Sequence, residues 1–191
     1  PQRRGENRIS LQEIEMSDMH LSDVTTLRER ARKNVENGAV TESYSADREE
    51  VLRLLNESLA TELVCVLRYK RHYFMANGLK AHVAADEFLE HATQEAQHAD
   101  RLAERIVQLG GEPEFNPDLL SKNSHAQYVA GNSLKEMVYE DLVAERIAID
   151  SYREIIQYIG EQDPTTRRIF EDILAQEEEH ADDMADILKD L

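Results

Sequence analysis

The chain contains the stretch Glu95-Ala96-Gln97-His98-Ala99-Asp100, and a similar stretch, Glu177-Glu178-Glu179-His180-Ala181-Asp182, follows about 82 residues later. In each stretch the glutamate precedes the histidine by three residues, so both side chains lie on one face of a helix. Two further glutamates, Glu62 and Glu145, precede these stretches at about the same interval. A glutamate from each of two helices, with a Glu-x-x-His from each of two others, is the sequence pattern of a two-metal site.

Each of these acidic residues belongs to an otherwise apolar stripe with helical spacing. The four stripes are Leu55, Leu59, Glu62, Val66, Tyr69 and Tyr73; Phe88, Glu95, His98, Leu102, Ile106 and Leu109; Leu142, Glu145, Ile149 and Tyr152; and Ile173, Glu177, His180 and Met184. Because the apolar side chains of a stripe face the core, we expect the glutamates and histidines among them to be buried as well.

Buried carboxylates require positive charge nearby. An unpaired carboxylate removed from water costs several kcal/mol, and four that converge would also repel one another. Two divalent cations balance the four negative charges, and two neutral imidazoles complete a mixed oxygen and nitrogen ligand set that suits iron, manganese or zinc. We therefore expect a metal site made by Glu62, Glu95, His98, Glu145, Glu177 and His180.

The composition favours one all-helical domain: of the 191 residues, 41% are hydrophobic, and glycine and proline are few. The net charge of −17 disfavours contact with nucleic acid phosphates and attracts cations. Cys65 is the only cysteine, which excludes an intramolecular disulfide and fits a reducing compartment. The sequence shows neither an apolar run long enough to span a membrane nor a secretory signal, so we expect a cytoplasmic location.

Capping and turn residues divide the chain. We predict an N-terminal arm at 1–46 and a bundle at 47–191 with long helices at about 47–75, 82–109, 133–159 and from 164 onward. Ser45 is the expected first N-cap, Ser133 and Glu136 form a capping box, and Asp163-Pro164 starts the last helix.

The N-terminal arm is predicted to contain one amphipathic helix that ends at Asn37-Gly38. Its apolar side is formed by Val24, Leu27, Ala31 and Val35. A basic tip at Arg3, Arg4 and Arg8 is interpreted as a solvated terminus, with contact to DNA or to a neighbouring subunit as the alternative.

The six site residues meet only if the second and third long helices run parallel, which requires the chain to return along the whole bundle between them. The linker from Gly110 to Asn132 is long enough for such a crossover, and it could hold a short helix near 124–129. A four-helix bundle with one long crossover is the ferritin-like topology.

The bundle resembles the bacterioferritins over roughly Asp47 to Leu191. The segments that carry the resemblance are Ala60-Thr61-Glu62-Leu63-Val64, Tyr69, Asn77-Gly78-Leu79, Glu95-Ala96-Gln97-His98-Ala99-Asp100, Asp141-Leu142-Val143-Ala144-Glu145 and Glu177-Glu178-Glu179-His180. The resemblance implies a ferroxidase that oxidises Fe(II) with dioxygen or hydrogen peroxide and stores the ferric product inside a hollow shell of subunits.

The resemblance also implies the role of each site residue. Glu62 with His98 would hold one iron ion and Glu145 with His180 the other, while Glu95 and Glu177 would bridge both. This amounts to two iron ions per subunit, for which manganese or zinc could substitute. Tyr69 would donate a hydrogen bond to a ligand, and Tyr152 is expected to pack and to form a hydrogen bond rather than to carry a radical.

Three departures from bacterioferritins change these expectations. Ala96 stands where those proteins have the haem-binding methionine, so no haem is expected. Only 11 residues follow His180, too few for the fifth helix of 24-subunit shells, and the N-terminal arm is additional. The last two features resemble the Dps-type mini-ferritins, so we expect a homo-oligomer of 12 subunits, with 24 as the alternative.

Two other functions remain open at this point. The same six ligands serve a discrete two-metal redox enzyme, such as a peroxidase or a manganese catalase, that stores no mineral. A DNA-protecting protein is disfavoured by the net charge.

The roles of two residues near the site are also open. Cys65 is expected to act as a small apolar residue. His91 could be an accessory ligand, although a hydrogen-bonded or exposed histidine is favoured.

Overall fold

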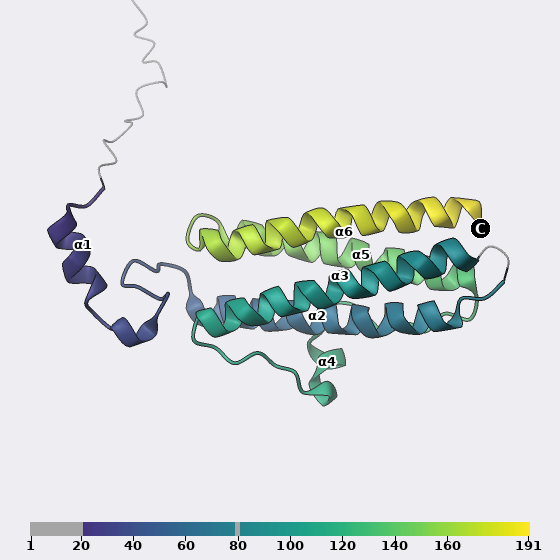
Figure 1. Cartoon of the computed structure of the whole chain (residues 1–191), viewed down its shortest axis with the longest axis horizontal. Coiled ribbons are helices and arrows are strands. Elements are labelled where there is room, and N and C mark those ends of the chain that lie inside the picture. The colour runs from purple at the N-terminus through teal and green to yellow at the C-terminus, as the bar shows by residue number, and fades with distance from the viewer. Residues whose placement is uncertain (1–20, 79–80) are drawn as a thin grey trace, which may run out of the picture.

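The computed structural model describes residues 21–78 and 81–191, and within them the regular structure is entirely helical. Four long helices lie side by side in a bundle (Figure 1). They are α2 (Arg48–Met75), α3 (Ala81–Gln108), α5 (Leu134–Ile159) and α6 (Pro164–Asp190). The predicted all-α four-helix bundle is therefore confirmed.

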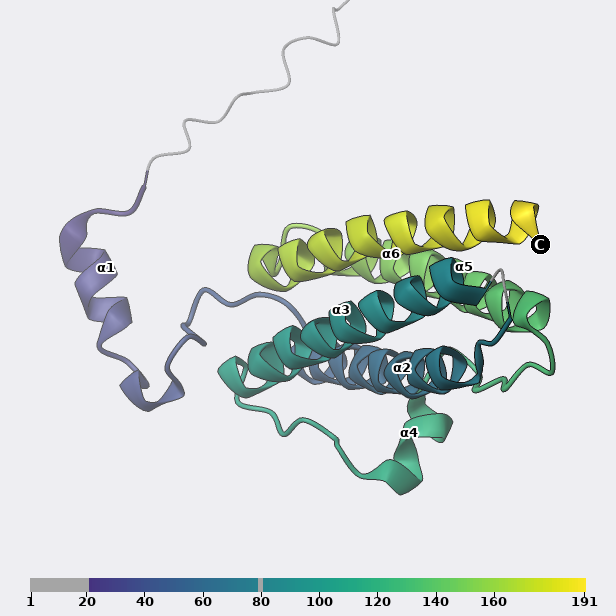
Figure 2. The same ribbon diagram turned by 45° about the vertical axis from the view of Figure 1, so that its right-hand side comes forward.

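The bundle is built from two helical hairpins. Helix α3 packs against α2, and α6 packs against α5. Between the hairpins the chain leaves the end of α3, runs back along the α2 side of the bundle and enters α5 at the opposite end (Figures 1 and 2). Helices α3 and α5 thus run in the same direction, as convergence of the six site residues requires.

The helix starts are set by side chains that accept backbone N–H bonds. Asp47 caps α2 by accepting from the N–H of Glu50, and Ser133 and Asp163 cap α5 and α6. The predicted N-cap Ser45 is wrong, since the carboxylate of Asp47 supplies the acceptor next to the first helical residue.

The short helix of the crossover also differs from the prediction. Helix α4 spans Pro117–Asn123 rather than 124–129 and packs against α2. Asn116 accepts from the N–H of Asp118, and Pro117 occupies the first helical position, where its lack of an N–H costs nothing. Residues after α4 are instead tied to α2, because the N–H of His125 donates to the Thr61 hydroxyl over 2.9 Å.

A buried ionic cluster holds the crossover and α5 to α2. The guanidinium of Arg68 donates to Asp141 over 2.7 Å, and His72 Nδ1 lies 2.7 Å from the second oxygen of the same carboxylate. Both side chains also bond backbone carbonyls of the crossover, at Gln127 and Ala130. Each of the three side chains in this cluster therefore has hydrogen-bond partners inside the core, and Asp141 fixes α5 one turn before Glu145.

The N-terminal arm contains two short helices instead of the single predicted one. Helix α1 (Val24–Ala31) ends before Asn34, whose φ of 49° places it in the left-handed region, and the 3-10 helix η1 (Val35–Asn37) follows. Figures 1 and 2 both show α1 apart from the bundle, and Val24 and Leu27 are exposed. The basic tip at Arg3, Arg4 and Arg8 lies outside the described residues.

Two apolar clusters fill the bundle on either side of its middle. One contains Val51, Leu55, Leu102, Ile159 and Phe170 among others, and the second includes Tyr69, Phe88, Val138 and Met184. The polar site residues lie between them. Across residues 21–78 and 81–191, none of the helices has the length and apolar content needed to cross a membrane.

Candidate binuclear metal centre

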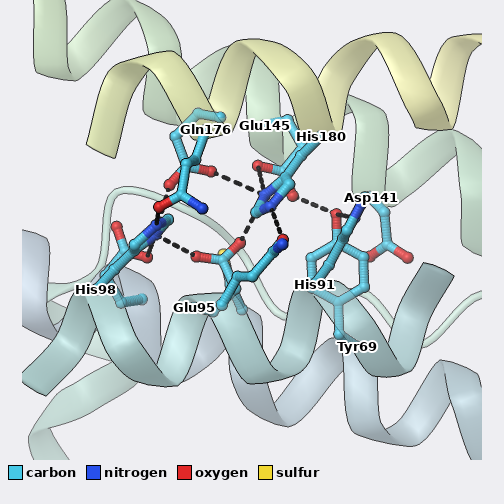
Figure 3. A network of polar contacts seen from close by, with 12 residues as sticks. Tyr69, His91, Glu95, His98, Asp141, Glu145, Gln176 and His180 are labelled. Carbon is cyan, nitrogen blue, oxygen red and sulfur yellow. Dashed lines mark hydrogen bonds and ion pairs between the residues drawn. The ribbon is translucent and has the colours of Figure 1, made fainter. Parts of the chain in front are cut away.

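Six buried polar side chains from four helices converge in the middle of the bundle (Figure 3). They are the six that the sequence pattern predicts: Glu62 from α2, Glu95 and His98 from α3, Glu145 from α5, and Glu177 and His180 from α6. Each is at most 2% exposed, so the structure brings together all the predicted residues in one solvent-excluded place.

The six residues form two overlapping groups. Glu62, Glu95, His98 and Glu177 make one group and Glu95, Glu145, Glu177 and His180 the other, with ligand atoms within 4.8 Å of one another in each. His98 Nδ1 lies 3.2 Å from a Glu62 oxygen, and His180 Nδ1 lies 4.0 Å from a Glu145 oxygen. Glu95 and Glu177 belong to both groups, as bridging carboxylates would.

Many of the converging atoms have no hydrogen-bond partner. Both oxygens of Glu95 and of Glu177, one oxygen of Glu145 and Nδ1 of His180 are buried and form no hydrogen bond with any residue that the structure describes. An unsatisfied buried polar atom costs about 1–3 kcal/mol, and more where it is charged. A pair of divalent cations would satisfy all six atoms at once, so the residues present fit two metal ions.

The titration behaviour of the group reflects its crowding. Burial and the neighbouring Glu95 raise the pKa of Glu62 to about 8, and burial likewise raises the pKa of Glu145. Burial works in the same direction on Glu95 and Glu177, but close contacts outweigh it and lower the pKa of both. These contacts are with Glu62 and the two histidines for Glu95, and with the two histidines and Glu145 for Glu177. The two outer glutamates, Glu62 and Glu145, therefore favour the protonated form, whereas Glu95 and Glu177 favour the ionised form.

The two histidines balance the ionised pair. Burial alone would lower the pKa of His98, but the carboxylates of Glu177, Glu62 and Glu95 outweigh it and raise that pKa. The same competition raises the pKa of His180 to about 9. Without bound cations the group thus favours two carboxylic acids, two carboxylates and two imidazolium ions, which together are neutral.

Two tyrosines orient the outer glutamates from the opposite hairpin. The Tyr69 hydroxyl of α2 donates to Glu145 of α5, and the Tyr152 hydroxyl of α5 donates to Glu62 of α2. Both tyrosines are fully buried. The bonds leave one carboxylate oxygen of each outer glutamate available to a cation, and they couple the two hairpins at the height of the site.

Two glutamines that the sequence patterns did not single out hold the histidines. His98 Nε2 lies 2.7 Å from Oε1 of Gln176 (Figure 3), and His180 Nε2 lies 2.6 Å from Oε1 of Gln94. Because an amide oxygen only accepts, each Nε2 carries a proton, and each Nδ1 faces the carboxylates. The sequence does mark these glutamines, because Gln94 and Gln176 stand directly before Glu95 and Glu177 in the two repeated motifs.

We expect Gln94→Leu to weaken metal binding about 10- to 100-fold, because His180 would lose the acceptor that fixes its tautomer and orientation. Chelator competition with Zn²⁺ measures the change. Gln97→Leu on the exposed side of α3 is the matched control and should bind as tightly as the unchanged protein. Equal affinities for the two variants would contradict the positioning role of Gln94.

His91 and Cys65, whose roles the sequence left open, are both buried near the site. Nδ1 of His91 lies 3.3 Å from the Tyr69 hydroxyl, and its ring stacks on that of His180 at a centroid distance of 4.0 Å. Burial and the His180 charge lower the pKa of His91 to about 3, so its imidazole is neutral. Burial raises the pKa of Cys65, which keeps it a thiol.

The fold and the arrangement of the six side chains match one class of protein: four-helix bundles whose facing helices direct carboxylate and imidazole side chains toward a metal site in the core. The chain belongs to the family of ferritin-like domains, whose model matches residues 52–191. Ala96 provides no metal-binding atom beside Glu95, and the absence of haem stays a prediction.

Comparisons with individual proteins agree with this assignment. The bacterioferritin of Mycobacterium avium is 35% identical over 139 residues, which are 70% of this chain and 80% of that protein. A dodecameric thioferritin of Bacteroides fragilis, described as bacterioferritin-related, is 31% identical, with a TM-score of 0.73 over 75% of this chain and 87% of that one. Dps from Thermosynechococcus elongatus, at 22% identity, shares the fold, with a TM-score of 0.70 over 73% and 90% of the two chains.

Proposed function

We propose that this protein is a ferroxidase that oxidises Fe(II) at an intrasubunit pair of metal positions and stores the ferric product in a hollow homo-oligomer. The observation that carries the proposal is the pair of overlapping ligand groups that share Glu95 and Glu177. The shared carboxylates would hold two ferrous ions next to each other, and bacterioferritin relatives support an iron-storage role. We also propose a cytoplasmic location, because a chain with one cysteine needs no internal disulfide and so fits a reducing compartment.

The six site residues would have different roles. Glu62 with His98 would bind one ferrous ion, Glu145 with His180 the other, and Glu95 and Glu177 both. Tyr69 and Tyr152 would keep the outer carboxylates in place, and Gln94 and Gln176 would keep each histidine with Nδ1 toward its ion. The apolar clusters on either side exclude bulk water from the site.

Two adjacent ferrous ions suit a two-electron oxidant. Each Fe(II) gives one electron, so the pair reduces dioxygen to hydrogen peroxide with two protons, or hydrogen peroxide to two water molecules with two protons. Either oxidant fits the proposal. A single iron position could supply only one of the electrons, which is why the shared glutamates matter to the reaction.

For the assembly, we propose 12 subunits with 24 as the alternative. Support comes from the Bacteroides fragilis relative, which is described as dodecameric. The net charge of −17 would also attract ferrous ions to such a shell.

The test combines native mass with iron loading. Twelve copies of the 22.0 kDa chain would give about 264 kDa. After addition of Fe(II) in air and gel filtration, the shell should retain far more ferric ions than the two per subunit that the binuclear centre alone could hold. A monomer or dimer that consumes hydrogen peroxide without retaining iron would refute the storage proposal. It would instead favour a discrete two-metal peroxidase or catalase.

A further inference from the structure

A second cluster of potential metal ligands lies beside the binuclear centre, on the same two helices that carry its Glu-x-x-His motifs. It consists of Glu87 and His91 of α3 and Asp183 of α6. His91 Nε2 lies 3.5 Å from an Asp183 oxygen and 3.7 Å from a Glu87 oxygen. One ligand atom from each residue falls within 4.8 Å of the other two.

The His91 side chain is directed into this cluster with its Nε2 unbonded. The side chain is 2% exposed, and Nδ1 is already occupied by the Tyr69 hydroxyl at 3.3 Å (Figure 3). Within residues 21–78 and 81–191, Nε2 has the two carboxylates as neighbours but no hydrogen bond to either. Because the Tyr69 hydroxyl donates to Glu145, Nδ1 of the neutral His91 ring is the donor to Tyr69, and the Nε2 lone pair faces the two carboxylates.

The spacing of these atoms fits a single cation. Two ligand atoms that are each about 2.1 Å from a metal ion at a tetrahedral angle are about 3.4 Å apart. The observed separations of 3.5 and 3.7 Å need only small rotamer changes to match. Two carboxylates neutralise a divalent charge, and an imidazole with two carboxylates is a donor set that Fe(II), Co(II) and Zn(II) accept.

We propose that Glu87, His91 and Asp183 form a third cation site, which binds one divalent transition metal ion beside the binuclear centre. The Glu87 and Asp183 side chains are 33% and 44% exposed, so water reaches the remaining coordination positions. Three protein ligands, two of them half-open to solvent, bind more weakly and exchange faster than the fully buried groups.

The site also connects to the centre through its own ligand. The His91 ring stacks on His180 at 4.0 Å, and its Nδ1 contacts the tyrosine that donates to Glu145. If the proposed function holds, an incoming ferrous ion would wait at this site before it enters the centre. This role rests on the proposed function, whereas binding of the cation does not.

The experiment uses Co²⁺ as a probe on the full-length assembled protein. Equilibrium dialysis in about 0.15 M salt, where surface charges are screened, should give three Co²⁺ per subunit. The variant Glu87→Gln with Asp183→Asn keeps His91 and its contacts, and it should bind two. The matched control Asp86→Asn with Asp182→Asn removes the same charge from exposed positions of α3 and α6 and should still bind three.

Two ions in the unchanged protein, or equal losses in both variants, would overturn the third site while leaving the binuclear proposal intact. Binding of no Co²⁺ would overturn both. An anomalous-scattering map of cobalt-soaked crystals of the unchanged protein provides a check independent of variant folding. A cobalt peak about 2.1 Å from His91 Nε2 is expected, and a map with peaks only at the binuclear centre would refute the site.

The waiting role has a separate kinetic readout. In stopped-flow mixing with less than one Fe(II) per subunit, the Glu87→Gln, Asp183→Asn variant should oxidise iron about tenfold more slowly than the Asp86→Asn, Asp182→Asn control. Equal rates for the two would show that the third cation is bound but is not on the path to the centre.

Discussion

Replacement of Glu95 by alanine is expected to reduce the rate of Fe(II) oxidation at least about a hundredfold. Loss of a side chain that only hydrogen-bonds to a metal ligand already lowers metal affinity or activity about 10- to 100-fold, and Glu95 is itself a proposed ligand. Glu95 belongs to both ligand groups, so its loss removes one ligand from each ion and the bridge between them. The initial absorbance change of ferric product after mixing with Fe(II) measures the effect.

The fold should survive this change. Glu95 lies 3.3 Å from His98 Nδ1, but among the described residues neither of its oxygens forms a hydrogen bond, so the alanine variant loses no structural hydrogen bond. Native mass and helical circular dichroism should match those of the unchanged protein. Glu104→Ala, on the exposed side of the same helix, is the control and should keep the full rate. A Glu95→Ala variant that oxidises iron at the control rate would exclude the shared-carboxylate site.

Metal binding should depend steeply on pH, and the direction follows from the raised pKa values. Glu62, with a pKa of about 8, and His180, with a pKa of about 9, both hold a proton at pH 7. The pKa values of Glu145 and His98 are raised as well. A cation must displace these protons, so affinity falls as the pH falls and levels off only above the raised pKa values.

The expected size of this effect is large. Each displaced proton changes affinity tenfold per pH unit, so four of them give up to about a ten-thousandfold change per unit for the pair. Zn²⁺ added to the protein in weakly buffered solution at pH 7 should release about four protons per subunit, as read by an indicator dye. The Glu95→Ala variant should release fewer. Release of no protons, or tighter binding at lower pH, would contradict the assigned protonation states.

Much of the site could be predicted because its residues follow local rules. Glu95 and His98 are one turn apart on one helix, and the apolar residues around them show that this face is buried. The repeat of the pattern at Glu177 and His180 supplies the second half. Asp163-Pro164 likewise marks the start of α6, since capping is decided within a few residues.

Elements without a repeating pattern were predicted less well. Helix α4 lies at 117–123 because Asn116 and Pro117 begin it there, whereas the polar stretch at 124–129 is held by Thr61 of α2. In the arm, the apolar spacing of Val24, Leu27, Ala31 and Val35 predicted one helix. The left-handed conformation of Asn34 instead divides it, and no neighbouring element within the described chain favours the longer helix.

The sequence alone determines that four helices each bury an acid and that two of them add a histidine, because helical periodicity relates residues three and four apart. Only the tertiary structure decides that Gln176 holds His98, that Gln94 holds His180, and that His91 faces Asp183. These pairs are about 80 to 90 residues apart in the chain and belong to different helices. Their contact depends on the rotation and height at which α3 and α6 pack, which no local spacing encodes.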